Sequence, residues 1–344
     1  MNQNNICLFA AGTMESGPFL TQFLEENGVE EAYFKNIDWT YQKDALMRAS
    51  NINEVKIPKV IHYVWFTNPL KEREMTDVAR NIEEVETSVA ALNQHGFSYN
   101  LWVNGEAKLN KTREWAESLG MKIRDIEELR GDDALANQAL DVAKEYIADK
   151  QFAAAADVTR VIIVHKQGGV YIDGDQVVWQ YDPILNNLDF FMYAHPYSGV
   201  YMIENSMIAS TPNNAILRNL LEDIVDRKIN KKKVFESECL NRSFYTALAE
   251  TGPIRLTFAY NKALEEGFME NKSYIILHDK LKNDDCNQES HDYEYCSKLD
   301  RNTPLPHDQN YDLKFITRHF GAGTWFDFKK DLKNIGRLRD IAEN

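Results

Sequence analysis

The chain has 344 residues, of which 44% are hydrophobic and 11% aromatic, enough for one sizeable core with additions. Its formal net charge of -14 gives a surface that repels phosphate backbones and anionic lipid, which argues against nucleic-acid binding as its main role. An anionic substrate such as a nucleotide diphosphate would therefore need a metal ion or a few well-placed cations.

The cysteines and the N-terminus indicate where the protein acts. Four widely spaced cysteines form no C-x-x-C pair, which favours reduced thiols in a cytoplasmic protein. A local bridge between Cys286 and Cys296, or a metal site with His291, is the alternative. No basic residue precedes the short apolar run 6–11, and no run approaches the roughly 20 apolar residues that a bilayer requires. We therefore expect a soluble, cytoplasmic protein.

Residues 1–55 are predicted to be a helical appendage. A short amphipathic helix begins at Pro18 and ends at Gly28, either as a lid on the main domain or as a docking arm. The main domain is predicted over 56–328, followed by a C-terminal helix over 329–344.

The main domain alternates strands and helices. A nearly continuous apolar strand begins at 57, helical spacing follows over 78–92, and strands at 99–104 and 121–126 flank a helix from about 111. This alternation predicts an α/β fold with a parallel sheet. Helices are then expected over 133–150 and 152–166, with Gly168 and Gly169 ending the second before a strand over 170–179.

The remaining elements are less regular. Strands are expected at 190–195 and 202–210, helices at 213–227, 241–250 and 254–266, and a strand at 274–278. A polar stretch over 280–310 is long for a loop in a compact domain, which is typical of a functional or disordered segment.

The strand over 170–179 carries a D-x-D motif. Alternate residues of a strand share a face, so Tyr171, Asp173 and Asp175 are predicted to point one way, and Val170 and Ile172 the other. The two carboxylates would project where open α/β sheets place their ligands. They repel each other unless a cation lies between them, and Mg²⁺ is usually held by one or two carboxylates plus substrate phosphates.

Three other interpretations of this motif were weighed. A calcium loop is excluded because Val177 stands at a ligand position and no glycine follows where that loop needs one. In a phosphotransferase, Asp173 would attack phosphorus and Asp175 would act as the general acid. The third interpretation is a solvated strand end without function.

Asp157 and Arg160 lie on the helix before this strand. Residues three apart on a helix share a face, so this pair can reach the same crevice, although it could also form only a surface ion pair. The alanines at 153–156 would let the helix pack closely against a ligand or a neighbour.

Several ordered blocks between about Ile57 and Trp325 resemble the DXD-containing sugar-transferase superfamily. They include residues 57–66, 153–176, 204–210, 251–253 and 319–325. That superfamily contains the glucosylating domains of large clostridial toxins and the yeast-type initiating α-mannosyltransferases. The resemblance implies a GT-A-like fold, a Rossmann-type mixed sheet flanked by helices with helical additions, and retaining transfer of a sugar with Mn²⁺ or Mg²⁺ as cofactor.

The resemblance also implies which residues bind the nucleotide, the donor sugar and the metal ion. Trp65 stacks on the uracil base, Asn104 and Tyr171 contact the nucleotide, and Asn205 lines the donor pocket. Asp157 and Arg160 bind the sugar hydroxyls, Asp173 and Asp175 are the motif acids, and His319, Thr324 and Trp325 close over the diphosphate. Asp157, Arg160, Asp173 and Asp175 are thus the predicted catalytic set, and His319 is the third candidate metal ligand.

Two residues depart from the toxin pattern. Ala156 stands where the toxins have Ser before the helical Asp, and His319 stands where their C-terminal segment supplies an acid. UDP-glucose or UDP-N-acetylglucosamine is the expected donor, and a protein or glycan the acceptor, with a bacterial effector secreted into a host cell as one setting. A binding module without turnover and an Asp-nucleophile phosphatase are the alternatives.

Overall fold

The computed structural model describes residues 39–52, 54–197, 200–230, 246–268, 272, 274–278 and 316–319. Several predicted features lie outside these residues: the helix expected from Pro18, the cysteines, the polar stretch 280–310, Thr324, Trp325 and the C-terminal helix over 329–344.

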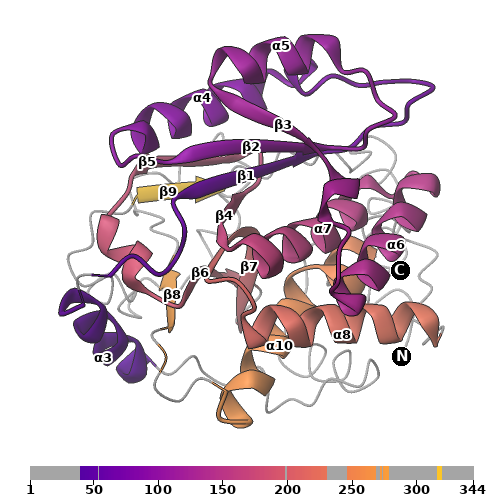
Figure 1. The fold of residues 1–344 in the computed structure, drawn as a ribbon. Coiled ribbons are helices and arrows are strands. Elements are labelled where there is room, and N and C mark those ends of the chain that lie inside the picture. The colour runs from indigo at the N-terminus through magenta and orange to yellow at the C-terminus, as the bar shows by residue number, and fades with distance from the viewer. Residues whose placement is uncertain are drawn as a thin grey trace, which may run out of the picture.

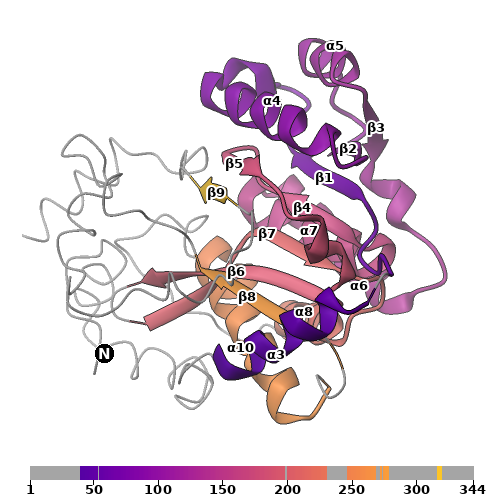
Figure 2. The ribbon, with the colours of Figure 1, turned by 90° about the vertical axis from the view of Figure 1, so that its left-hand side faces the viewer.

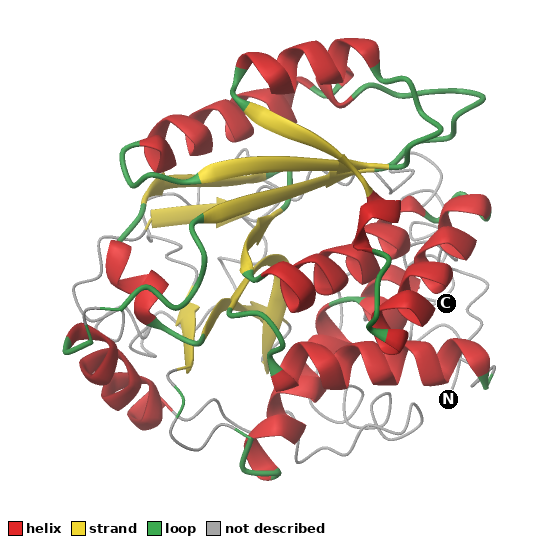
Figure 3. Ribbon diagram, in the orientation of Figure 1, coloured by secondary structure: helices red, strands yellow, loops and turns green. Residues whose placement is uncertain are grey.

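A seven-stranded sheet organises the described part of the chain (Figures 1 and 3). Its strands stand in the order β3-β2-β1-β4-β7-β6-β8. Their bounds are β1 Val60–Trp65, β2 Ser98–Val103, β3 Met121–Asp125, β4 Gly169–Ile172, β6 Phe190–Tyr197, β7 Val200–Ser210 and β8 Tyr274–His278. A separate two-stranded sheet pairs β5 (Gln176–Gln180) with β9 (Ile316–His319).

The sheet is mixed. Strands β1 to β4 run parallel to one another, whereas β7 runs antiparallel to both β4 and β6, and β8 runs parallel to β6. The predicted α/β fold, a mixed sheet flanked by helices, is confirmed. The carboxyl ends of β1 and β4 meet at one edge, and this edge positions the site described below.

Helices cover both faces of the sheet (Figures 1 and 2). On one face, α4 and α5 lie over β1 to β3, and on the other lie α6, α7 and α8. Their bounds, with those of two further helices, are α3 Trp39–Ser50, α4 Ala79–Asn93, α5 Asn110–Ser118, α6 Ala134–Ala148, α7 Phe152–Gln167, α8 Ala215–Ile229 and α10 Pro253–Glu265. Shorter turns are η2 Met75–Asp77, η3 Ile126–Leu129, η4 Pro183–Asn187 and the π-helical η5 Thr246–Thr251.

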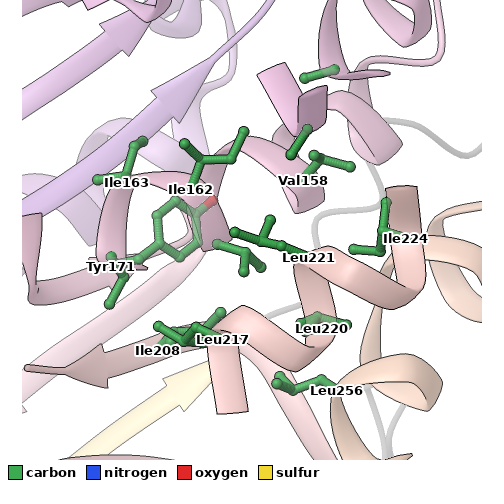
Figure 4. Packing of buried hydrophobic residues seen from close by; sticks show 14 of the residues in the cluster. Val158, Ile162, Ile163, Tyr171, Ile208, Leu217, Leu220, Leu221, Ile224 and Leu256 are labelled. Atoms are coloured by element: carbon green, nitrogen blue, oxygen red, sulfur yellow. The ribbon is translucent and has the colours of Figure 1, made fainter. Parts of the chain in front are cut away.

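Two apolar cores form, one on each face of the sheet, because successive side chains of a strand point to opposite faces. In β1, Ile61 and Tyr63 pack into the core shared with α3 and α4, whereas Val64 packs into the core shared with α6, α7 and α8. The same alternation sends Tyr171 of β4 toward α7, where Figure 4 shows its ring beside Ile162. Because successive side chains of a strand point to opposite faces, only every second residue of β4 can contact Asp157 and Arg160 on α7.

The single strand predicted over 170–179 is wrong. Strand β4 ends at Ile172, and β5 begins at Gln176 after a turn that contains Asp173, Gly174 and Asp175. The motif acids therefore lie in the turn rather than on one face of a continuous strand.

Helix α3 belongs to the predicted appendage, yet Ala45 and Ala49 are fully buried in the core beneath the sheet. The side-chain amide of Asn187 donates to the backbone oxygens of Ala49 and Ile52, at 3.3 and 2.8 Å. The division at residue 55 remains a prediction. Within the described residues, no helix has the length and apolar character needed to cross a membrane.

Candidate functional site

Six side chains from four elements converge at the carboxyl end of β4. They come from α7, from the end of β4, from β7 and from η5: Asp157, Arg160, Tyr171, Asp173, Asn205 and Thr251. Five of them were predicted as site residues, and the structure brings these five together.

Arg160 is the centre of this cluster. Its two terminal nitrogens contact both carboxylate oxygens of Asp173, at 3.2 and 3.1 Å, in a fork geometry. The same guanidinium lies 3.0 Å from Oδ1 of Asp157 and donates to the backbone oxygen of Asn205 at 2.6 Å. Its side chain is 6% exposed, so a single buried cation holds two carboxylates.

Tyr171 supports this arrangement from the sheet. The guanidinium carbon of Arg160 lies 4.6 Å from the centre of its ring, and its hydroxyl donates to Oδ1 of Asp173. Burial raises the pKa of Tyr171 well above its ordinary value, and the nearby carboxylate of Asp173 raises it further. The phenol thus remains a hydrogen-bond donor at any physiological pH.

Asp157 is held by three groups. Its Oδ1 accepts from the side-chain amide of Asn205 at 2.8 Å and forms an ion pair with Arg160, and its Oδ2 accepts from the hydroxyl of Thr251 at 2.8 Å. Burial raises the pKa of Asp157 to about 6, although the charge of Arg160 and these donors act in the opposite direction. This carboxylate is therefore ionised at neutral pH and close to its titration range.

The local sequence explains the placement. Asp157 and Arg160 lie three residues apart on α7 and form an ion pair on one face of that helix, as predicted. Ala154 and Ala155 are fully buried, so the first turns of α7 pack closely against their neighbours. The surface ion pair weighed as an alternative is contradicted by the burial of both side chains.

The turn after β4 fixes the motif acids. The backbone N–H of Asp173 donates to the carbonyl of Ser206 at 2.7 Å, and its own carbonyl accepts from Gln176 at 3.0 Å. Asp175 lies in the same turn and is partly exposed. In the β5–β9 pair, His319 stands opposite Gln176, which places its backbone beside the motif. The side chain of His319 lies outside what the structure describes.

Trp65 and Asn104 lie at the carboxyl ends of β1 and β2. The indole N–H of Trp65 donates to the backbone oxygen of Arg73 at 2.8 Å. The amide of Asn104 accepts from the N–H of Thr67 at 3.2 Å and donates to its carbonyl at 3.0 Å. Asn104 is 6% exposed, and these two bonds show it holding the loop after β1. Their predicted contacts with a nucleotide remain predictions.

Thr251 is the site residue that the sequence analysis did not identify. It directly precedes Gly252 and Pro253, and these three residues form one of the blocks of the resemblance. That block was the available signal, but nothing in its spacing indicates a partner 94 residues away.

The donor set suits a hard divalent cation. Asp173 and Asp175 carry carboxylate oxygens in the turn after β4, the ligand type that Mg²⁺ and Mn²⁺ prefer. In the part of the chain described by the structure, no group of three or more His, Cys, Asp or Glu side chains is arranged to hold a metal ion. A cation bound by one or two carboxylates would need further oxygen ligands, such as those of a phosphate.

Residues 72–191 match the family model described as a glycosyltransferase sugar-binding region containing a DXD motif. The predicted resemblance to the DXD-containing glycosyltransferases is thereby confirmed over residues 72–191. None of the curated proteins matches the sequence.

Similar folds occur among solved structures. The PaToxG glycosyltransferase has 15% sequence identity and a TM-score of 0.46, over 67% of this chain and 79% of its own. The UDP-bound glycosyltransferase domain of the YGT toxin has 14% identity and a TM-score of 0.44, over 65% of this chain and 80% of its own. The ligand-free form of that domain has 13% identity and a TM-score of 0.43, with the same coverage.

Proposed function

We propose that the chain is a retaining, metal-dependent glycosyltransferase that moves a sugar from a nucleotide diphosphate to a protein or glycan. The observation that carries this proposal is the buried Arg160, which joins Asp157 to Asp173, the first acid of the D-x-D motif. One charge network thereby links the predicted sugar-binding pair to the predicted metal site.

The electrostatics of the cluster favour a divalent cation. Both oxygens of Asp173 bind Arg160, and one also accepts from Tyr171, so this carboxylate is committed to organising the site. Asp175 follows in the turn and is proposed as the direct metal ligand, with His319 as a further ligand. A bound Mn²⁺ or Mg²⁺ would neutralise charge on the leaving diphosphate.

Asp157 and Arg160 are proposed to orient the donor sugar. The ionised carboxylate accepts hydrogen bonds from sugar hydroxyls, and the guanidinium donates to them. Asn205 and Thr251 already fix the carboxylate, so little reorganisation is required when the sugar arrives. A double-displacement mechanism would require a nucleophilic carboxylate about 5–5.5 Å from its partner. The acids here are occupied, so we propose attack on the face from which the diphosphate departs.

The nucleotide would lie across the carboxyl ends of β1 and β4. Trp65 is proposed to stack on the base, with Asn104 and Tyr171 beside the nucleotide, and Thr324 and Trp325 to close over the diphosphate. The stacking tryptophan favours UDP-glucose or UDP-N-acetylglucosamine as donor. Action as a bacterial effector on a host protein is the setting we propose.

The test is nucleotide release from a panel of nucleotide sugars, with Mn²⁺ or with EDTA. We expect metal-dependent release from one donor, reduced at least about 100-fold in Asp173→Asn and Asp175→Asn, because each removes a charge from the donor site. Asp141→Asn, which alters a 63% exposed carboxylate on α6, is the matched control and should retain activity.

Release that persists in EDTA, or in Asp175→Asn, would contradict the metal role. Cleavage of para-nitrophenyl phosphate without release from any nucleotide sugar would favour the phosphatase alternative. The geometry opposes that alternative, because both oxygens of Asp173 contact Arg160, one in a hydrogen bond and the other in an ion pair, and are poorly placed to attack phosphorus. Binding of UDP and Mn²⁺ without turnover would instead identify a binding module.

A further inference from the structure

Thr251 makes a contact that joins two distant parts of the chain. Its hydroxyl donates to Oδ2 of Asp157 at 2.8 Å, across 94 residues of sequence. Both residues are buried, with 2% and 5% of their surface exposed. An ionised carboxylate can only accept, so the hydroxyl of Thr251 is the donor in this contact.

The two oxygens of Asp157 have different partners. Arg160 and Asn205 both bind Oδ1, whereas Thr251 binds Oδ2. The terminal torsion of an aspartate is broad, and the contacts at Oδ1 restrain it but supply no donor to Oδ2. The bond from Thr251 satisfies the second oxygen, so that the plane of the carboxylate is held through both of its oxygens.

The backbone that follows Thr251 lets its side chain approach Asp157 closely. A Cβ added to Gly252 would lie 1.8 Å from the carbonyl oxygen of Ala247 and 3.4 Å from Oδ2 of Asp157. Only glycine permits this close approach of η5 to its own following turn. Pro253 then starts α10 at the first helical position, where its missing N–H is not needed.

Neighbouring elements anchor this turn. The hydroxyl of Thr257 on α10 donates to the carbonyl of Pro253 at 2.8 Å and accepts from the N–H of Ile203 at 2.9 Å. Strand β7, which contains Ile203, also carries Asn205. The two residues that hold Asp157 from opposite sides are therefore connected to each other through α10.

We infer that Thr251 is a positioning residue, which acts through Asp157 to align the carboxylate with the donor sugar. This inference rests on the proposed function, because it assigns Thr251 a role in binding the sugar and none in binding the nucleotide. The sugar-dependent part of donor affinity, rather than nucleotide affinity, is what Thr251 controls.

Calorimetric titration with UDP-glucose, UDP-N-acetylglucosamine and UDP, each with Mn²⁺, tests this inference. Thr251→Val keeps the shape of the side chain and removes the hydroxyl. We expect it to bind the preferred UDP-sugar about tenfold more weakly while its affinity for UDP is unchanged, because a hydrogen bond to a charged group is lost. Thr251→Ser restores the hydroxyl and should recover most of the affinity.

Thr159→Val is the matched control. It makes the same substitution on α7, two residues from Asp157, at a buried hydroxyl for which the structure records no hydrogen-bond partner. It should leave both affinities unchanged, and thermal melts of all three variants would show that each is folded.

An equal loss of affinity for UDP and UDP-sugar in Thr251→Val would show a general structural role and overturn the inference. Unchanged affinity for both would overturn it as well. If the unaltered protein binds neither UDP-sugar nor UDP, the proposed function itself fails, and this inference fails with it.

Discussion

At the scale of single residues, His62 is a buried side chain whose two ring nitrogens both have hydrogen-bond partners. Its Nδ1 accepts from the indole N–H of Trp102 at 3.2 Å, and Nε2 lies 3.1 Å from the carbonyl of Gly168. An indole nitrogen can only donate, so Nδ1 must be the unprotonated nitrogen. The second nitrogen then carries the proton and donates to Gly168.

This network predicts the titration of His62. Burial lowers its pKa from 6.5 to about 4, against a smaller opposite effect of the hydrogen bond to Gly168. Between these values the unfolded chain binds a proton that the folded protein does not, so unfolding becomes easier as pH falls. The free energy of unfolding should lose up to about 3 kcal/mol from this residue between pH 6.5 and pH 4.

Nitrogen-15 NMR of the histidines would check both the tautomer and the lowered pKa of His62. We expect His62 to show the Nε2–H tautomer and no titration between pH 7 and pH 5, while urea denaturation gives lower stability at pH 4.5 than at pH 7. A His62 signal that titrates near 6.5 would refute the assignment.

The site residues differ in how far the sequence could predict them. The pairing of Asp157 with Arg160 follows from the period of a helix, which is a local property. Tyr171 does meet Asp173, but Asp173 lies in the turn after β4, so the strand period that predicted this pair is not its cause. Thr251 could not be found in this way, because its contact depends on where η5 packs against α7. Local periodicity therefore identifies pairs within one element and misses partners supplied by another.

At the scale of elements, the junction between α7 and β4 depends on Gly168. Its φ of 65° and ψ of -162° lie in a region that is essentially restricted to glycine. A Cβ there would lie 2.7 Å from Cδ of Pro212 and 2.9 Å from Cδ of Pro58. The predicted helix end at this glycine is confirmed. Its backbone conformation favours glycine, and the two prolines leave no room for a Cβ.

Gly168→Ala is expected to cost about 3 kcal/mol of stability, because backbone strain and overpacking add. Gly120→Ala is the control, since Gly120 has φ of 75° but no heavy atom within 4 Å of an added Cβ. It should cost only about 1 kcal/mol, from conformation alone. Urea denaturation measures the loss in free energy of unfolding for each variant. Equal losses would show that Pro58 and Pro212 shift to accommodate the added Cβ, which would contradict the expected overpacking.

At the scale of the whole molecule, alternating strands and helices predicted the four parallel strands β1 to β4. The reversal of β7 has no counterpart in side-chain periodicity, because a strand has the same period in either direction. The bend after β4 was missed for a related reason, since apolar residues continue at Val177 and Val178 on the far side of the turn. Strand direction and sharp bends are set by tertiary pairing rather than by local pattern.

Ligand binding should be linked to the stability of the whole fold. The proposed site joins α7, β4, β7 and η5, so a ligand held there stabilises only the folded chain. UDP and Mn²⁺ together, at about 100 times the dissociation constant, should raise the melting temperature by about 4 °C. Either one alone should raise it much less, since the metal bridges the acidic turn and the diphosphate.

Asp175→Asn separates this linkage from general charge effects. It should lose the joint effect of UDP and Mn²⁺, because the substituted amide binds a hard cation more weakly than a carboxylate does. Asp141→Asn, with its 63% exposed carboxylate on α6, should keep the full rise. A joint rise that persists in Asp175→Asn, or in the presence of EDTA, would mean that the nucleotide is held without the proposed metal.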